Sequence, residues 1–412
     1  MDRYVFCKNV KVLFNEKKVI IGNALTGHWI KISKECYDII QEGIQKKMCV
    51  EDVIKSFEDN NDKKYLQNLY NCLFQMEVLR QENAPEPLPQ KNIVVALTHK
   101  CNLKCKHCFV SASPEMRDEL SFDEIIKIVD KICKSKVEYL AFTGGEPLVR
   151  RDILEILRYT RNHFLGKICL MTNGTLITNE NVKEIVGCVD SIDISIDGVD
   201  EETCSQIRGK NVFNKVIHAI ELLHEEGFTK ISLSMVLTKE NIIYEKKFDE
   251  LNKKLGTSPM KRKFSPIGRG AENREKFEIK LDLNEKPILD IKAAQQEVSI
   301  CHCGALTRTL YIGYDGYIYP CNTLDRKEYS LGKIEEYDSI DAFYESCCFE
   351  KNLGYKKLEE IFPENFEKCK KCNVNLFCWE CLHFIDMVKS GVESISNCEK
   401  RKKELQEIVW NN

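Results

Sequence analysis

The sequence has no long apolar run and little net charge of either sign. No stretch reaches the roughly 18 apolar residues of a membrane-spanning helix, and the first residues lack the apolar segment of a signal peptide. The 61 basic and 64 acidic residues nearly balance, which leaves a formal net charge of −3. This balance gives no indication of a nucleic-acid or anionic-membrane partner. We therefore expect a cytoplasmic protein with no nucleic-acid partner and no membrane partner.

Cysteine is the residue in clear excess, with 21 copies among 412 residues. Disulfides are typical of small secreted domains, so in a long chain without an export signal we interpret clustered cysteines as metal ligands. They gather in three groups, at 101–108, 301–321 and 369–398. We interpret the scattered remainder as small apolar residues of the interior. The length itself predicts two to three domains.

The first cysteine group has the spacing Cys101-x3-Cys105-x2-Cys108 and directly follows the apolar run 93–97. Three thiolates from one loop can face a common centre, and no fourth cysteine lies nearby in the sequence. Structural zinc sites and closed iron–sulfur cubanes both take four protein ligands. The spacing therefore predicts a [4Fe–4S] cluster with one iron free to bind another molecule. The alternative is three buried cysteines without a ligand.

Residues 93–270 alternate between strand and helix patterns, which predicts a parallel sheet with helices outside it. Six strands are fewer than the eight of a closed barrel, so we expect an open, partial barrel whose chemistry lies at the carboxyl ends of its strands. The predicted strands are 93–98, 139–143, 167–172, 191–196, 230–237 and 261–266, and the predicted helices are 121–134, 153–163, 179–186, 212–226 and 243–254.

Candidate ligand-binding residues follow two of these strands. After the second strand, Gly144 and Gly145 let the backbone approach a ligand closely, and the carboxylate of Glu146 can bind an ammonium group. Ser195 lies at the end of the fourth strand, and Arg208 follows that strand. An arginine suits a carboxylate because its planar fork makes paired, charge-assisted hydrogen bonds.

The three-cysteine loop and the Gly-Gly-Glu-Pro motif one βα unit later resemble the radical S-adenosylmethionine (SAM) enzymes. The resemblance implies a partial (β/α)6 barrel in which a [4Fe–4S] cluster on Cys101, Cys105 and Cys108 cleaves SAM to a 5′-deoxyadenosyl radical. It also implies an electron donor such as flavodoxin or ferredoxin. His107 holds the position where the family usually has an aromatic residue. The SAM contacts that the resemblance implies are Gly144, Gly145 and Glu146 for the amino group, and Ser195 and Arg208 for the ribose and carboxylate.

The C-terminal cysteines resemble the SPASM extension of radical SAM proteins, which carries two auxiliary [4Fe–4S] clusters. Two residues separate Cys378 from Cys381, where the family usually has three, so the second ligand set and the presence of an open iron stay undecided. A four-thiolate zinc site at 369–381 is the alternative. The resemblance implies one cluster on Cys369, Cys372, Cys378 and Cys398, and another on Cys303, Cys321 and Cys381 with Cys301 as candidate fourth ligand.

Residues 1–84 are predicted to form a winged-helix-like module. Strands at 10–14 and 19–21 flank a turn, and helices are predicted at 33–45, 50–57 and 64–78. The order resembles the recognition element of radical SAM peptide-modifying enzymes, where a leader peptide adds a strand to the sheet edge. The partner it implies is a precursor peptide; a generic winged-helix domain or structural cap is the alternative.

The predicted organisation is a leader-binding module (1–84), a proline-rich linker (85–92), a radical SAM core (93–270), a connecting segment (271–294) and a SPASM domain (295–412). The whole resembles maturases of ribosomally made peptides of the sactipeptide or ranthipeptide type, which implies an enzyme that forms a cysteine sulfur-to-carbon thioether by oxidation. A carbon–carbon crosslink is the next choice. The sequence is also compatible with a formylglycine-forming sulfatase maturase, or with a non-enzymatic iron–sulfur or zinc scaffold.

Overall fold

The computed structural model describes residues 3–87, 91–117, 120–278, 298–346, 351–378, 381–391 and 398–411. The chain forms two compact units. The larger unit comprises residues 90–282 and 309–356, and the smaller comprises 1–89, 283–308 and 357–412. The predicted connecting segment 271–294 is described only as far as residue 278. None of the helices in the described ranges combines the length and apolar character needed to cross a membrane.

The larger unit is built on one eight-stranded sheet with the order β11-β10-β9-β8-β7-β6-β12-β13. The strands from β6 to β11 are mutually parallel and lie side by side in chain order. Most apolar residues of β6 to β10 are buried, as is usual in a parallel sheet with covered faces. The strands are β6 (Lys91–Ala96), β7 (Val137–Thr143), β8 (Lys167–Thr172), β9 (Ser191–Ser195), β10 (Ile231–Leu237), β11 (Ser258–Lys263), β12 (Thr309–Ile312) and β13 (Ile318–Tyr319).

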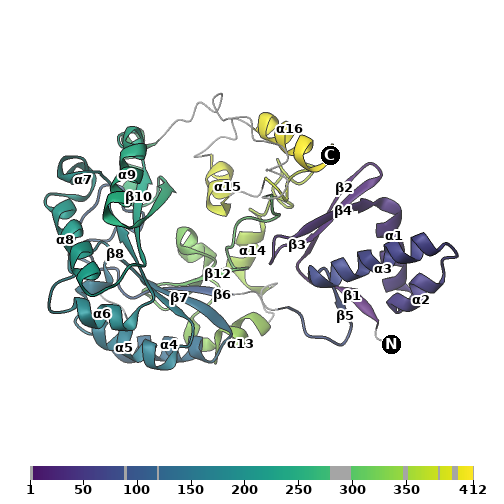
Figure 1. Ribbon diagram of the computed structural model, residues 1–412, viewed down its shortest axis with the longest axis horizontal. Helices are drawn as coiled ribbons and strands as arrows, with labels where there is room; N and C mark the ends of the chain where they lie inside the picture. The colour runs from purple at the N-terminus through teal and green to yellow at the C-terminus, as the bar shows by residue number, and fades with distance from the viewer. Residues whose placement is uncertain are drawn as a thin grey trace. The chain divides into compact units, whose positions relative to one another are not determined.

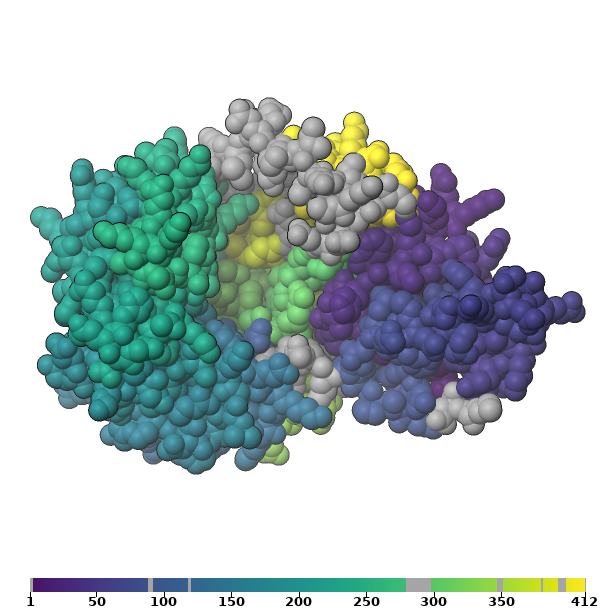
Figure 2. Space-filling view, viewed as in Figure 1, coloured from purple at the N-terminus to yellow at the C-terminus, as the bar shows by residue number. Residues whose placement is uncertain are grey.

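Helices lie along the outer side of these strands (Figure 1). In Figure 2 the atoms of residues 122–188, coloured blue to teal, form a continuous outer surface. Ser121 and Glu124 form the predicted capping box: each side chain accepts a hydrogen bond from the other residue's backbone N–H. The helices are α4 (Phe122–Cys133), α5 (Ile153–His163), α6 (Val182–Cys188), α7 (Glu201–Arg208), α8 (Val212–Glu225), α9 (Glu245–Leu255), α10 (Arg269–Glu272), α11 (Arg274–Phe277) and α13 (Ile340–Glu345).

The predicted parallel α/β sheet is confirmed, with three differences. The last parallel strand is 258–263, where mostly exposed, polar residues give no alternating pattern. Helix α7 has only eight, mainly polar residues, and so lacked a sequence signal. Strands β12 and β13 come from the cysteine-rich C-terminal region and extend the sheet beyond β6. Closure of the six parallel strands into a partial barrel stays a prediction.

The N-terminal part of the smaller unit has a three-stranded antiparallel sheet, β2-β3-β4, and a separate β1–β5 pair. The predicted hairpin is present, with Asn15 paired to Lys18 and the intervening Glu16 at a φ of 53°. Tyr4 and Tyr70 are buried in its core, with their hydroxyl oxygens 2.8 Å apart. The elements are β1 (Tyr4–Phe6), β2 (Val10–Asn15), β3 (Lys18–Asn23), β4 (Trp29–Ser33), α1 (Lys34–Gln45), α2 (Val50–Lys55), α3 (Asn60–Gln75) and β5 (Leu79–Gln81).

C-terminal segments complete this smaller unit. The Trp29 indole packs edge-on against Phe377, with ring centroids 4.9 Å apart, and its N–H donates to the carbonyl oxygen of Val298. Lys18 donates to the carbonyl oxygen of Trp410. The first 89 residues and the last cysteines therefore share one packed unit. The remaining helices are α14 (Leu353–Glu359), which crosses the boundary between the two units, α15 (Leu382–Lys389) and α16 (Cys398–Val409).

Candidate cofactor-binding site

The three-cysteine loop follows β6 in the larger unit. Cys101 and Cys105 are each 8% exposed, and Cys108 is partly buried. The pKa of the Cys101 thiol is raised to about 12, mainly by burial, with contributions from Glu146, Cys105 and Cys108. The three thiols therefore interact with one another electrostatically. They fit a metal cluster, because binding to a cationic centre is what makes such buried thiols ionise.

Arg269, at the start of α10, fixes the backbone of this loop. Its guanidinium donates to the carbonyl oxygens of Cys105 at 3.0 Å and Ala112 at 2.5 Å. Its backbone N–H donates to the carbonyl oxygen of Cys108. The preceding Gly268 has a φ of 54°, and a Cβ there would lie 2.3 Å from the carbonyl oxygen of Phe109. Residues after the last parallel strand thus hold the shape of the loop after the first.

The two glycines of the Gly-Gly-Glu-Pro motif pack against the segment that leads into this loop. A Cβ on Gly144 would lie 2.3 Å from the carbonyl oxygen of Thr98, and its φ is 148°. A Cβ on Gly145 would lie 2.3 Å from the carbonyl oxygen of Lys100. Both are backbone atoms, which cannot move aside as the end of a flexible side chain can. Glycine is therefore required by the neighbouring backbone.

Glu146 is fully buried and accepts hydrogen bonds from three uncharged donors. They are the hydroxyl of Thr172 at 2.7 Å and the backbone N–H groups of Asn173 at 2.6 Å and Leu148 at 3.0 Å. Burial raises the pKa of this carboxyl group despite those hydrogen bonds. A cationic ligand would offset the cost of burying the charge. The site thus fits the ammonium group that the sequence predicts there.

Ser195 and Arg208 lie near the carboxyl end of β9, with Asp197 between them in sequence. The Arg208 guanidinium donates to Asp197 at 2.5 Å and lies 3.9 Å from the Cys105 sulfur. His107 also donates to Asp197, at 2.5 Å. Burial alone would raise the pKa of Asp197, but Arg208 and His107 lower it below its usual range. Sequence reasoning gave Asp197 no role, because its partners are 11 and 90 residues away in the chain.

The smaller unit contains the predicted auxiliary-cluster cysteines except Cys321. The pKa of Cys369 is raised to about 11, mainly by burial, with contributions from Cys398 and Cys372. Burial likewise raises the pKa of Cys303, and Cys381 adds to the increase. Two groups of thiols thus influence one another electrostatically, and their assignment to two clusters stays a prediction. The group members are Cys369, Cys372 and Cys398 in one, and Cys303, Cys381 and the buried Cys301 in the other.

Cys378 also lies in the smaller unit, where its backbone N–H donates to the carbonyl oxygen of Val374. Cys321 lies in the larger unit after β13, with its sulfur 3.2 Å from the Thr323 hydroxyl. Within the described ranges, no three His, Cys, Asp or Glu side chains are arranged to hold a single metal ion. The zinc alternative at 369–381 would need such an arrangement, whereas each thiolate of a cubane binds its own iron.

Two parts of the sequence match known protein families. Residues 95–251 match the radical SAM superfamily. Residues 301–373 match the SPASM iron–sulfur cluster-binding domain. A radical SAM domain binds a [4Fe–4S] cluster and SAM, and a SPASM domain binds auxiliary iron–sulfur clusters. The buried thiols, Glu146 and Arg208 are of the chemical kinds that these cofactors require.

Named relatives include a maturase and a bacteriocin biosynthesis protein. The mycofactocin maturase MftC of Mycolicibacterium smegmatis is 35% identical over 178 residues, which cover 43% of this chain and 45% of MftC. The subtilosin biosynthesis protein AlbA of Bacillus subtilis is 29% identical over 320 residues, covering 69% of this chain and 65% of AlbA. The chain thus spans about half the length of the first of these curated relatives.

Solved structures share the fold. SuiB of Streptococcus suis, bound to SAM, superposes with a TM-score of 0.57 at 17% identity, covering 93% of this chain and 96% of SuiB. The enzyme anSMEcpe, with bound AdoMet and a peptide, gives a TM-score of 0.56 at 19% identity, covering 78% of this chain and 97% of its own. Such low identities establish the fold alone. The two matches identify a radical SAM domain at residues 95–251 and a SPASM iron–sulfur cluster-binding domain at residues 301–373 of this chain.

Proposed function

We propose that this protein is a peptide maturase that cleaves SAM reductively and crosslinks a ribosomally made precursor by oxidation. The proposed product is a thioether between a cysteine sulfur and a carbon of the same peptide. One observation carries the SAM-dependent part: the fully buried Glu146 carboxylate, held by neutral donors, lies next to the three-cysteine loop and suits an ammonium ligand. The peptide and the bond formed rest on the relatives and on the N-terminal module.

Each group of the site has a proposed task. Cys101, Cys105 and Cys108 would hold the SAM-binding [4Fe–4S] cluster, which would supply the electron for SAM cleavage. Glu146 binds the amino group of SAM, within the backbone turn of Gly144 and Gly145. Arg208 binds the SAM carboxylate, with Ser195 at the ribose. Asp197 is a positioning residue, because it holds the guanidinium of Arg208 while lying fully buried itself.

The C-terminal cysteines would hold two auxiliary clusters that accept the electron left by oxidation of the substrate. We assign Cys369, Cys372, Cys378 and Cys398 to one cluster, and Cys303, Cys321 and Cys381, with Cys301 as candidate fourth ligand, to the other. A cytoplasmic flavodoxin or ferredoxin would donate the electron that starts each turnover.

The N-terminal module (1–84) would bind the leader of the precursor. The strand order β2-β3-β4 puts β2 and β4 at the edges of their sheet, and a free edge can accept an added strand. Phe14 on β2 is 52% exposed and packs edge-on against Tyr37, with ring centroids 5.3 Å apart. This gives the edge an apolar contact for a peptide side chain. SuiB, which is known bound to its precursor peptide SuiA, aligns with 94% of this chain in that complex.

The formylglycine alternative shares the SAM and SPASM machinery but needs no leader-binding module. The alignment with SuiB, which is known in complex with a precursor peptide, covers 93% of this chain and therefore includes most of the N-terminal module. This coverage favours a peptide maturase with a recognition element. The carbon–carbon crosslink stays the second choice, because both crosslinks use the same hydrogen abstraction.

The decisive experiment is anaerobic incubation of the reconstituted protein with SAM, a reductant and a candidate precursor, followed by mass spectrometry. We expect loss of two hydrogens for each crosslink and release of 5′-deoxyadenosine. The variant Cys105→Ala should abolish both, whereas Cys369→Ala should retain SAM cleavage and lose the crosslink. Equal loss of SAM cleavage in both variants would contradict the separate roles of the clusters, and an unchanged precursor mass with wild-type protein would remove the proposed activity.

Leader binding has a separate test that preserves the packed smaller unit. Phe14→Asp should weaken precursor affinity at least tenfold, measured by equilibrium titration. Tyr65→Asp is the matched control, because Tyr65 is also 52% exposed but lies on α3 rather than on β2. Equal affinities for both variants would contradict leader binding at this strand.

A further inference from the structure

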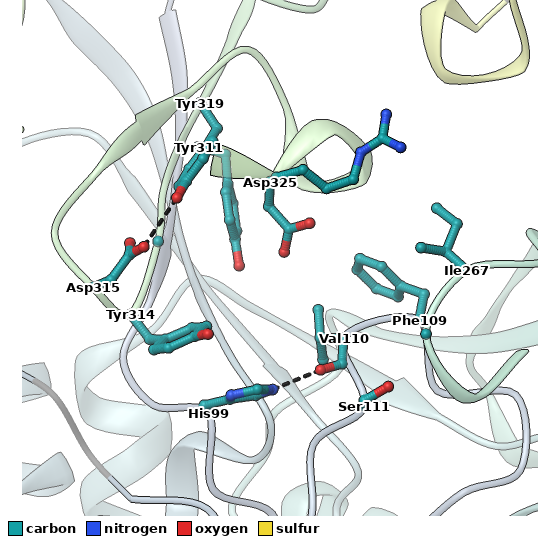
Figure 3. Close-up of a pocket in the computed structure, with 13 residues that line it drawn as sticks. His99, Phe109, Val110, Ser111, Ile267, Tyr311, Tyr314, Asp315, Tyr319 and Asp325 are labelled. Atoms are coloured by element: carbon teal, nitrogen blue, oxygen red, sulfur yellow. Dashed lines mark hydrogen bonds between the residues drawn. The ribbon is translucent and has the colours of Figure 1, made fainter. Parts of the chain in front are cut away.

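A pocket with a volume of about 240 Å³ lies in the larger unit beside the three-cysteine loop (Figure 3). One wall is formed by Phe109, Val110 and Ser111, which directly follow Cys108 in the chain. The opposite wall comes from β12 and the segments after it, which supply Tyr311 and Asp325. The pocket thus lies next to the proposed radical-generating cluster and is formed entirely within one unit.

Aromatic rings make up much of the pocket lining. Tyr314 stacks on the ring of His99, with centroids 4.4 Å apart. Phe109 and Tyr311 face the open space in Figure 3. Sulfur makes favourable contacts with aromatic rings. The walls therefore suit a thiol-bearing side chain.

Two carboxylates line the pocket, and their surroundings differ. Asp315 accepts hydrogen bonds from the Tyr319 hydroxyl at 2.9 Å and from the backbone N–H of Tyr317 at 3.1 Å. No other residue of the described chain donates a hydrogen bond to the carboxylate of Asp325. Figure 3 shows this carboxylate between Tyr311 and Phe109, directed into the space. Asp325 is thus a half-buried carboxylate whose hydrogen bond within the described residues comes from its own backbone N–H.

Asp325 is also the group best suited to take up a proton near neutral pH. Burial raises its pKa to about 6; the nearby charge of Asp315 adds to the increase, while His99 and Arg326 oppose it. A catalytic base works best when its pKa is close to the operating pH. Burial raises the pKa of Tyr311 well above 10, so its phenol stays neutral. The remaining titratable lining groups are Tyr314 and Tyr319, and the His99 ring bonds through Nε2 to the carbonyl oxygen of Val110 at 2.6 Å.

We propose that this pocket binds the precursor cysteine that becomes part of the thioether, and that Asp325 accepts its thiol proton. This assignment rests on the proposed peptide-crosslinking function. A free thiol has a pKa of about 8.5 and is mostly protonated at pH 7, so a base beside it increases the fraction of reactive thiolate.

The step balances in atoms and electrons. A C–H bond and an S–H bond of the precursor break, and one C–S bond forms. The hydrogen atom of the C–H bond leaves on the nucleoside derived from SAM, and the thiol proton moves to Asp325. The one remaining electron passes to an oxidised auxiliary iron–sulfur cluster.

The test uses a precursor that carries deuterium on the carbon to be crosslinked. Mass spectrometry measures deuterium in 5′-deoxyadenosine and thioether in the peptide between pH 5 and pH 9. In the wild type, thioether formed per deuterium transferred should rise with a midpoint near pH 6. In Asp325→Asn, this ratio should fall at least tenfold at pH 7 and recover toward pH 9, where the thiol ionises unaided. Asp325→Glu should restore the ratio, and the exposed Asp338→Asn is the control.

A wild-type ratio and midpoint in Asp325→Asn would overturn the assignment, as would deuterium transfer that leads to a product other than a thioether. If Asp325→Asn does not load iron, the wild-type protein and Asp325→Glu provide the test. A midpoint near pH 8.5 in the wild-type pH dependence of thioether formed per deuterium transferred would exclude Asp325 as the base.

A second measurement needs no turnover. The precursor cysteine should be at least tenfold protected from iodoacetamide when bound to the wild type, and Val110→Trp, which fills the pocket, should remove the protection. Protection without deuterium transfer would support the pocket assignment and refute the proposed function. Deuterium transfer without protection would support the proposed function and refute the pocket assignment.

Discussion

The fully buried carboxylate of Asp197 lies 2.5 Å from Nε2 of His107, the residue next to the third cysteine of the loop. A carboxylate only accepts hydrogen bonds when ionised, so His107 donates. The same carboxylate oxygen accepts from Arg208, and the other oxygen accepts from the backbone N–H of Val236 at 2.7 Å. Asp197 therefore links the cysteine loop, the fifth parallel strand β10 and the predicted SAM carboxylate site.

Replacing Asp197 by Asn should weaken SAM binding at least tenfold. The change keeps the shape of the side chain but leaves Arg208 and His107 without their shared negative charge. Removing one partner of a buried ion pair costs about 3–5 kcal/mol, so the melting temperature should also fall. Equilibrium SAM titration of the iron-loaded protein checks the affinity. Asp193→Asn, at another buried carboxylate on β9, is the control and should change the affinity less than twofold.

Replacing Glu146 by Gln should also reduce SAM affinity, by about 2 kcal/mol or thirtyfold. A glutamine has one acceptor oxygen, whereas Glu146 uses both of its oxygens for Thr172, Asn173 and Leu148. The new amide group would face a donor and could not attract an ammonium ion. The same titration gives the result, with the exposed Glu155→Gln on α5 as control. A wild-type affinity in Glu146→Gln would refute the ammonium assignment.

Replacing Gly145 by Ala should lower the iron content of the reconstituted protein. Its Cβ would meet the Lys100 carbonyl oxygen at 2.3 Å, and relief of that clash would displace the segment leading to Cys101. Iron analysis and the cluster absorbance band measure the effect. Gly187→Ala is the matched control, because a Cβ there meets no atom within 4 Å. Because Gly187 lies in helix α6, Gly187→Ala should increase the stability of the folded protein by at most about 1 kcal/mol.

Asp325→Asn should stabilise the protein more at neutral pH than at acidic pH. The pKa of Asp325 is about 6 in the folded chain, whereas the ordinary pKa of an aspartate, taken for the unfolded chain, is 3.8. A carboxyl group with a raised folded pKa favours the folded state below its unfolded pKa and loses that contribution as pH rises through 6. The difference amounts to at most about 3 kcal/mol. The melting temperature of the variant minus that of the wild type should therefore increase between pH 5 and pH 7.5; no increase would contradict the raised pKa.

Several parts of this molecule could be predicted because their signals are local. The spacing of Cys101, Cys105 and Cys108 is fixed within one loop, and the capping box of Ser121 spans a single helical turn. The apolar runs of the parallel strands alternate with helical patterns, so the α/β sheet could be predicted. Strand β11 and helix α7 could not, because their mostly polar residues carry no periodic burial signal.

The partners that complete the candidate site were decided by the tertiary structure. Glu146 meets Thr172 and Asn173 only because β7 and β8 are adjacent and in a particular register. Asp325 faces the cysteine loop across the pocket, and β12 brings Tyr311 to the same place by pairing with β6.

The sequence by itself thus determined the candidate cofactor ligands, the parallel sheet and the helix start at Ser121, since each depends on neighbours along the chain. The tertiary structure alone decided which buried charge faces which partner. Side chains far apart in sequence meet only when strand pairing and packing fix their positions, and the electrostatic effect of burial then depends on those positions.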